Sequence, residues 1–116
     1  MRVLHSIVFA AILSMASLAQ AETLKVTVKE RVTSADAQAG TQALRALPQT
    51  ANVYVSTQRR VYAVEVRDGQ RMIDSEVSNR LARAGQTVTS IRHSNNSFEY
   101  VKQQLKRSPH RYSKWG

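Results

Sequence analysis

The chain offers few side chains that could carry out acid–base, nucleophilic or metal chemistry. It has no cysteine and three histidines, which excludes a thiolate nucleophile, a disulfide and a cysteine-based metal site. Only His93 and His110 lie beyond the first 21 residues. A metal site built from them would need a carboxylate and a C-terminal tail that folds back, and no serine or aspartate stands out as a triad partner. We therefore expect His93 to be a surface residue just past the last strand. We expect no enzymatic activity and no cofactor.

Three acidic residues, Asp68, Asp74 and Glu76, could together bind a hard cation. Their spacing does not match that of a calcium-binding loop. Asp68 lies in the turn signal Arg-Asp-Gly-Gln at residues 67–70. The other two lie in the first turn of a predicted helix, where a carboxylate is favourable beside the positive end of the helix dipole. We interpret all three as structural residues.

Basic residues interleaved with aromatic ones give a stronger signal near the C-terminus. Residues 92–116 contain six lysines and arginines against one acid, Glu99. Cations beside aromatic rings suit an anionic membrane interface, where the ring anchors the segment and the cation pairs with phosphate. The residues expected to contact an anionic partner are Lys102, Lys106, Arg107, Arg111 and Trp115, with Arg59 and Arg60 at a predicted hairpin tip as a second cationic point. The alternative is a packed helix with a solvated polar face and a basic end.

The first 21 residues have the pattern of a secretory signal peptide. Arg2 and His5 form a short basic start, residues 7–18 are an apolar run, and Ala-Gln-Ala at residues 19–21 is a small-x-small cleavage signal. The apolar run is shorter than the about 20 residues that span a bilayer. We expect cleavage after Ala21, a periplasmic or secreted protein, and no transmembrane segment in the mature chain.

The net charge of the whole chain bounds its partners. Seventeen lysines and arginines against eight acids give a formal net charge of +9, and a charge of this size attracts polyanions. Because the chain carries an export signal, we expect anionic lipid or lipopolysaccharide, or an envelope or host protein, and no nucleic acid. The alternative is that the charge only maintains solubility.

Hydrophobic periodicity predicts the elements that position these residues. Strands are predicted at residues 24–28, 53–55, 61–66 and 87–91, and helices from the cap at Thr33 to Leu47, from Ile73 to Ala84, and from Phe98 to about Ser108. The order of the first six elements is the split βαβ, or ferredoxin-like, arrangement. It predicts an α+β fold in which a four-stranded antiparallel sheet carries two helices on one face. We expect a signal peptide at residues 1–21, a ferredoxin-like domain at 22–92, and a basic helix and tail at 93–116.

Local signals refine the three helices. Thr33 and Asp36 fit a capping box at the start of the first helix, and the small residues Gly40 and Ala43 indicate its close approach to the sheet. Gly85 is a probable cap at the end of the second helix. The second helix has an apolar stripe that includes Ile73, Val77 and Leu81. The third has the stripe Phe98, Val101 and Leu105, so it needs an apolar surface, either the bare sheet face or the end of the sheet.

Several of these segments match the pattern of a known family. The first helix ends in Ala-Leu-Arg-Ala-Leu-Pro at residues 43–48, and Leu-Ala-Arg-Ala-Gly at residues 81–85 closes the second. With the first strand and the hairpin, these make residues 24–91 resemble the heavy-metal-associated domain of copper chaperones and metal-transporting ATPases. The resemblance implies the ferredoxin-like fold. The family's Met-x-Cys-x-x-Cys loop falls on Arg31, Thr33 and Asp36, which lack the sulfur that Cu(I) needs, so its metal site is not implied.

Three functional hypotheses from different classes follow. The leading one is a small, exported, non-enzymatic binding module of the bacterial envelope, which contacts anionic components or a protein partner through its basic C-terminal segment. The alternative is a periplasmic metal-handling relative of the heavy-metal-associated domains with altered ligands, chosen from His93, His110 and Met72. The third is a small periplasmic enzyme, which no motif supports. The sequence leaves the oligomeric state open, because an exposed strand edge or a bare sheet face could drive dimerisation.

Overall fold

The sheet has four strands in the order β2-β3-β1-β4, and every neighbouring pair is antiparallel. The computed structural model describes residues 22–107. Its elements are β1 (Glu22–Val28), α2 (Ser34–Arg45), β2 (Thr50–Ser56), β3 (Val61–Val66), α3 (Asp74–Arg83), β4 (Val88–Ser94) and α4 (Phe98–Lys106). This topology confirms the predicted α+β, ferredoxin-like fold. The expected signal peptide and three residues of interest, His110, Arg111 and Trp115, lie outside the described residues. Between residues 22 and 107 no helix is both long and apolar enough to cross a bilayer.

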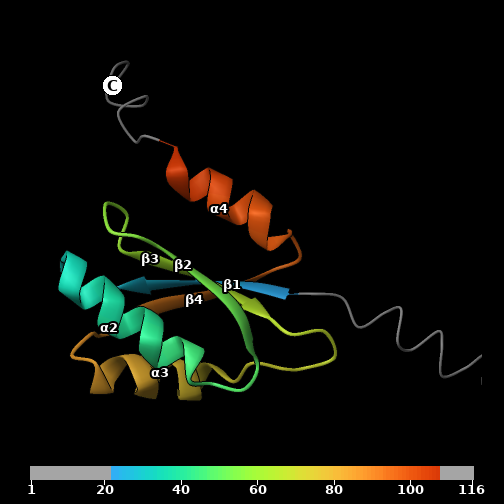
Figure 1. The fold of residues 1–116 in the computed structure, drawn as a ribbon, viewed down its shortest axis with the longest axis horizontal. Helices are drawn as coiled ribbons and strands as arrows, with labels where there is room; N and C mark the ends of the chain where they lie inside the picture. The colour runs from blue at the N-terminus through green and yellow to red at the C-terminus, as the bar shows by residue number, and fades with distance from the viewer. Residues whose placement is uncertain (1–21, 108–116) are drawn as a thin grey trace, which may run out of the picture.

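The helices form layers on both faces of the sheet (Figure 1). Helices α2 and α3 cover one face, and α4 lies on the other. The main core fills the space under α2 and α3, because alternate residues of the central strands point to that side. Its fully buried residues include Leu24 and Val26 of β1, Tyr62 of β3, Leu44 of α2 and Leu81 of α3.

The second, smaller core lies under α4. Phe98, Val101 and Leu105 are buried together with Ala63 of β3, and Tyr54 of β2 packs against them. The predicted stripe of the third helix is therefore confirmed, and the bare sheet face is the surface that it covers. Helix α4 packs mainly on β3 and less on β1 and β2, so β4 is the strand that it leaves largely uncovered on this face. All the described elements pack on one another within residues 22–107, so a chain that begins at Glu22 retains every core residue that the structure describes.

Helix α2 begins with the predicted capping box. The Thr33 hydroxyl accepts a hydrogen bond from the Asp36 amide at 3.1 Å, and the Asp36 carboxylate accepts one from the Thr33 amide at 3.2 Å. The predicted close approach of this helix is also present. A side chain at Gly40 would overlap the Tyr62 phenol, which lies directly beneath it.

A buried polar network joins α2, β3 and the loop after α3. The Tyr62 hydroxyl donates to Gln86 Oε1 at 2.6 Å, and Gln86 Nε2 donates to the backbone carbonyl of Asp36 at 2.8 Å. Gly85, at a φ of 84°, turns the chain at the end of α3 as predicted and so directs Gln86 into this position. Burial, more than any other cause, raises the pKa of Tyr62, so the phenol stays protonated as a donor.

Two details of the predicted elements are wrong. Ile73 was expected in the apolar stripe of the second helix, but it is the N-cap residue of α3 and 48% exposed. Its backbone is extended, so its side chain is out of register with the helix, and the neighbouring Met72 fills the core instead. The last strand runs to Ser94 rather than residue 91, so His93 lies inside β4 and not after it. Pairing with β1 supplies the hydrogen bonds that extend the strand.

Candidate anion-binding site

The α4 side of β1 and β4 carries a polar strip that the helix leaves open. Leu24 and Val26 point into the main core. Because successive side chains of a strand alternate between its two faces, Lys25 and Thr27 point to the α4 side. In the antiparallel register Lys25 is opposite Arg92, and Thr27 is opposite Ser90. Two cations and two hydroxyl groups therefore stand side by side on rigid strands.

A cleft lies between this strip and the C-terminal end of α4. Its larger part has a volume of about 460 Å³, and a smaller hollow adjoins it. The residues that line the two parts are Lys25, Thr27, Arg59, Val61, Ser90, Arg92, Gln104, Leu105 and Arg107. Four of these carry a positive charge, and within the described residues no carboxylate lines the cleft.

Arg59 reaches the cleft from the turn between β2 and β3. Its Nη2 donates to the backbone carbonyl of Arg107 at 3.0 Å, and its amide donates to Ser56 Oγ at 3.3 Å. Its Nε is buried with no hydrogen-bond partner among residues 22–107. The neighbouring Arg60 turns away, and its Nη1 donates to the Lys29 carbonyl at 3.0 Å. Of the two arginines predicted at the hairpin tip, only Arg59 therefore contributes to the cleft.

Lys102 and Lys106 lie on the opposite flank of α4, over β2. Their Nζ atoms are 5.8 and 5.9 Å from the centroid of the Tyr54 ring, within the range of a cation–π interaction. Two like charges at i and i+4 repel each other, and the shared ring offsets part of that repulsion. The predicted anion-binding residues therefore lie in two places. Arg107 lines the cleft, whereas Lys102 and Lys106 lie on the other flank of α4.

Within residues 22–107 these cations form no ion pair with an acidic residue. We call the six of them the cationic face: Lys25, Arg59, Arg92, Lys102, Lys106 and Arg107. In the part of the chain that the structure describes, the only ion pairs are those of His93. Glu65 lies on the same side of the sheet, but it accepts a hydrogen bond from Asn52 at 2.6 Å. Glu99, in the first turn of α4, is a second acid on this side of the sheet, but the six cations outnumber the acids and the face carries a net positive charge.

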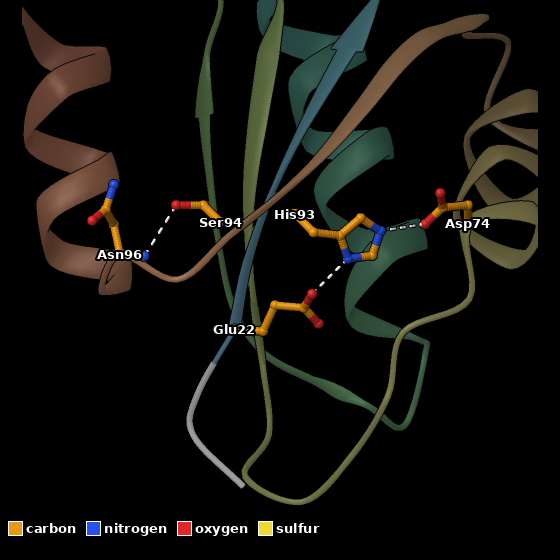
Figure 2. Close-up of polar contacts among 5 residues, drawn as sticks. All are labelled: Glu22, Asp74, His93, Ser94 and Asn96. Atoms are coloured by element: carbon orange, nitrogen blue, oxygen red, sulfur yellow. Dashed lines mark hydrogen bonds and ion pairs between the residues drawn. The ribbon is translucent and has the colours of Figure 1, made fainter. Parts of the chain in front are cut away.

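His93 forms a separate cluster on the α2–α3 side, at the end of the sheet where β1 begins (Figure 2). Its Nδ1 lies 2.6 Å from Glu22 Oε2, and its Nε2 lies 2.7 Å from Asp74 Oδ1. The hydrogen bond with Glu22, followed by that with Asp74, raises the pKa of His93 against the opposing effect of burial. Asp74 was expected only to stabilise a helix start, but it also joins α3 to β4. Sequence reasoning missed this cluster because its members are far apart in the chain.

Comparison with known proteins identifies the fold. No family model and no curated protein matches the chain. The N-terminal domain of ZntA in its apo form is 21% identical, with a TM-score of 0.52, and the match covers 65% of this chain and 94% of that domain. The yeast copper transporter domain Ccc2a, solved in its apo and Cu(I)-loaded states, is 14% identical, with a TM-score of 0.51 and coverage of 66% and 99%. The fold is that of a heavy-metal-associated domain. The predicted resemblance is confirmed at the level of fold.

The loop where heavy-metal-associated domains carry their metal motif does not fit a soft metal ion here. Thr33 and Asp36 stand at the two cysteine positions, and their side chains are bonded to each other's backbone in the capping box. Arg31 stands at the methionine position. Across residues 22–107 no group of three or more histidine and carboxylate side chains could hold a metal ion. The heavy-metal-associated fold is thus present without its ligand set.

Proposed function

We propose that this chain is a small, exported, non-enzymatic binding module that holds an anionic component of the bacterial envelope against its cationic face. The observation that carries the proposal is the gathering of six cations on one side of the molecule, with no ion-pair partner among residues 22–107. Ordinary charged surfaces intersperse both signs. A surface of one sign instead attracts ligands of the other sign and speeds their binding.

Repulsion within the cationic face supports a role in binding rather than in stability. Lys25 opposite Arg92 is a like-charged cross-strand pair, and such pairs are destabilising. Lys102 and Lys106 add a like-charged pair along α4. The helix dipole favours a cation in the last turn of α4, which accounts for Lys106 but not for the strand pair. An anion that bridges these charges turns the repulsion into attraction.

The signal pattern in residues 1–21 supports a place for this binding outside the cytoplasm. In that compartment the abundant polyanions are phospholipid headgroups and lipopolysaccharide phosphates. A cation near such a surface gains about 1 kcal/mol, and several together give stable attachment. The predicted site residues Arg111 and Trp115 follow Arg107 in sequence and extend the same basic and aromatic composition. A protein with an acidic surface is the other partner of matching chemistry.

Vesicle binding tests the proposal. The chain 22–116 is mixed with vesicles of phosphatidylglycerol and phosphatidylcholine, or of phosphatidylcholine alone, at low and physiological salt. We expect binding only to the anionic vesicles, retained at physiological salt. A variant with Lys102, Lys106, Arg107 and Arg111 changed to glutamine should lose most of this binding.

The matched control removes the same charge from the other side of the molecule. It carries glutamine at Arg45, Arg71, Arg80 and Arg83, which lie on α2, on α3 and before α3. We expect this control to bind nearly as well as the natural chain. Equal loss in both variants would mean that binding follows net charge alone, and the proposal would fail.

A second candidate, metal handling with altered ligands, is favoured by the two solved domains that share the fold, one of them with Cu(I) bound. Of its three candidate ligands, Met72 is buried in the core, both ring nitrogens of His93 face carboxylates, and His110 lies outside the described residues. Titration with Cu(I) and with Zn²⁺ decides the matter. Stoichiometric uptake that is lost in the H93A/H110A variant would support this candidate, and no uptake would remove it.

A further inference from the structure

We propose that the cleft lined by Lys25, Arg59, Arg92 and Arg107 is a seat for a phosphate group with at least two negative charges. This inference rests on the proposed function, because it names the chemistry of the anion and the place where it binds. It distinguishes a specific phosphate-binding site, the seat, from Lys102 and Lys106 on the other flank of α4. Those two lysines would attract anions only through their charge.

The donors in the cleft suit phosphate. Each guanidinium presents a planar fork of N–H groups that matches two phosphate oxygens, and three arginines line the cleft. Lys25 adds a compact ammonium from the floor. The hydroxyls of Thr27 and Ser90 lie next to it on the same strands and can donate to the remaining oxygens.

Much of this arrangement is fixed before any ligand binds. Lys25 and Arg92 project from adjacent paired strands, so the sheet sets the separation of their Cα atoms. The Arg59 guanidinium is held by one hydrogen bond, from Nη2 to the backbone carbonyl of Arg107, while its Nε has no partner among residues 22–107. Sites built on rigid elements lose little entropy when they bind.

The lining residues also indicate which classes of ligand the cleft does not bind. Without a carboxylate among the described lining residues, it has no negatively charged ligand for a metal cation, and its four positive side chains repel one. Its apolar lining is limited to Val61 and Leu105, which is too little to hold a hydrophobic ligand. A carboxylate ligand has one charge for four cations, whereas a phosphate monoester or pyrophosphate has at least two near neutral pH. The same group can come from a soluble phosphate compound or from a lipid that carries a phosphate monoester, such as phosphatidic acid, whereas the phosphodiester of phosphatidylglycerol carries only one charge.

Calorimetric titration of chain 22–116 with pyrophosphate tests the seat. We expect one saturable site, and a loss of affinity of roughly tenfold or more in the K25Q/R92Q variant, because each removed charge takes away a charge-assisted hydrogen bond. The control R80Q/R83Q removes two charges from α3 and should bind as the natural chain does. An unchanged unfolding midpoint or a higher one shows that K25Q/R92Q is folded. Absence of a saturable site, or equal weakening in both variants, would overturn the inference.

Vesicles distinguish the two sources of phosphate. If pyrophosphate displaces chain 22–116 from vesicles of phosphatidic acid and phosphatidylcholine, and K25Q/R92Q weakens both interactions, the seat takes a lipid phosphate monoester. If the chain binds pyrophosphate through these residues but does not bind the vesicles, the seat stands with a soluble ligand and the envelope-surface function fails. If vesicle binding is strong while K25Q/R92Q changes nothing, the function stands and the seat is overturned.

Discussion

Lys25 and Arg92 are register partners across β1 and β4, with no acidic side chain in the cleft that they line, as far as residues 22–107 show. Directly opposite like charges in an antiparallel pair repel each other. The pair therefore places positive charge on the α4 side of the sheet at a cost in stability. This pair is the clearest sign that the face serves a ligand rather than the fold.

Removing one member of this pair should stabilise the fold. We expect Lys25→Gln to raise the free energy of unfolding by about 0.2–1 kcal/mol, the range for cross-strand pairs. Urea denaturation of the natural chain and the variant measures the difference. Arg83→Gln, an exposed residue at the end of α3, is the control and should leave stability nearly unchanged or lower it slightly. A clear loss of stability in Lys25→Gln would mean that Lys25 has a favourable partner.

His93 should make stability depend on pH. The carboxylates of Glu22 and Asp74 raise its pKa in the folded state above the ordinary value of 6.5. The folded state therefore holds the proton more tightly, and the stabilisation is complete below that ordinary value and lost as pH rises through the raised pKa. We expect the free energy of unfolding to fall as pH rises above about 6.5 and through the raised pKa of His93 in the natural chain, and much less in H93Q. If the free energy of unfolding depended on pH equally in the natural chain and in H93Q, the ion pairs of His93 would be contradicted.

The close approach of α2 to the sheet gives a prediction with an unusual sign. Glycine to alanine in a helix normally stabilises by about 0.5–1 kcal/mol, but a methyl group at Gly40 would overlap the buried Tyr62 phenol. We expect Gly40→Ala to destabilise by about 1–3 kcal/mol, as overpacking does. Gln42→Ala on the exposed side of the same helix should be neutral or slightly stabilising.

A double-mutant cycle checks the cause of that loss. Tyr62→Phe removes the hydroxyl, the atom nearest the added methyl group. The Gly40→Ala change should therefore cost less in the Tyr62→Phe background than in the natural chain. Additive losses would show that the hydroxyl is not the group against which the added methyl group collides.

The loop before α2 should accept the missing metal motif. We expect the R31M/T33C/D36C variant to bind Cu(I) through its two thiolates, because these positions are the N-cap and N3 of α2 and already approach each other in the capping box. The loss of the cap should cost about 0.5–2 kcal/mol. A cysteine pair at Arg80 and Arg83 is the control for adventitious binding. Failure of the loop variant to bind Cu(I) more tightly than this control would mean that the loop is not equivalent to the family's.

Much of the fold could be predicted because its signals are local. The strand at residues 61–66 is rich in β-branched and aromatic residues and bounded by turn signals, and the structure has it with the same bounds. The capping box at Thr33 needs only the next three residues. Ile73 was misplaced because apolar spacing cannot tell the residue before a helix from one within it, and capping geometry decides that point.

The candidate sites could be predicted only in part because they depend on pairing between distant strands. The basic C-terminal composition pointed to Arg107 and to the lysines of α4, but not to Lys25, which looks like an ordinary polar residue of an alternating strand. Only the antiparallel register places it opposite Arg92. The contacts of His93 with Glu22 and Asp74 likewise arise when β1, β4 and the start of α3 meet.

The most direct test of the central claim is the map of amide chemical-shift changes in chain 22–116 as pyrophosphate is added. We predict saturable changes that cluster on β1, β4, the turn at Arg59 and the end of α4, around Lys25 and Arg92. Amides of α2 and α3 on the opposite side of the sheet should change little. Changes centred on α2 and α3, or small changes that never saturate, would contradict the claim that the cationic face is an anion-binding site.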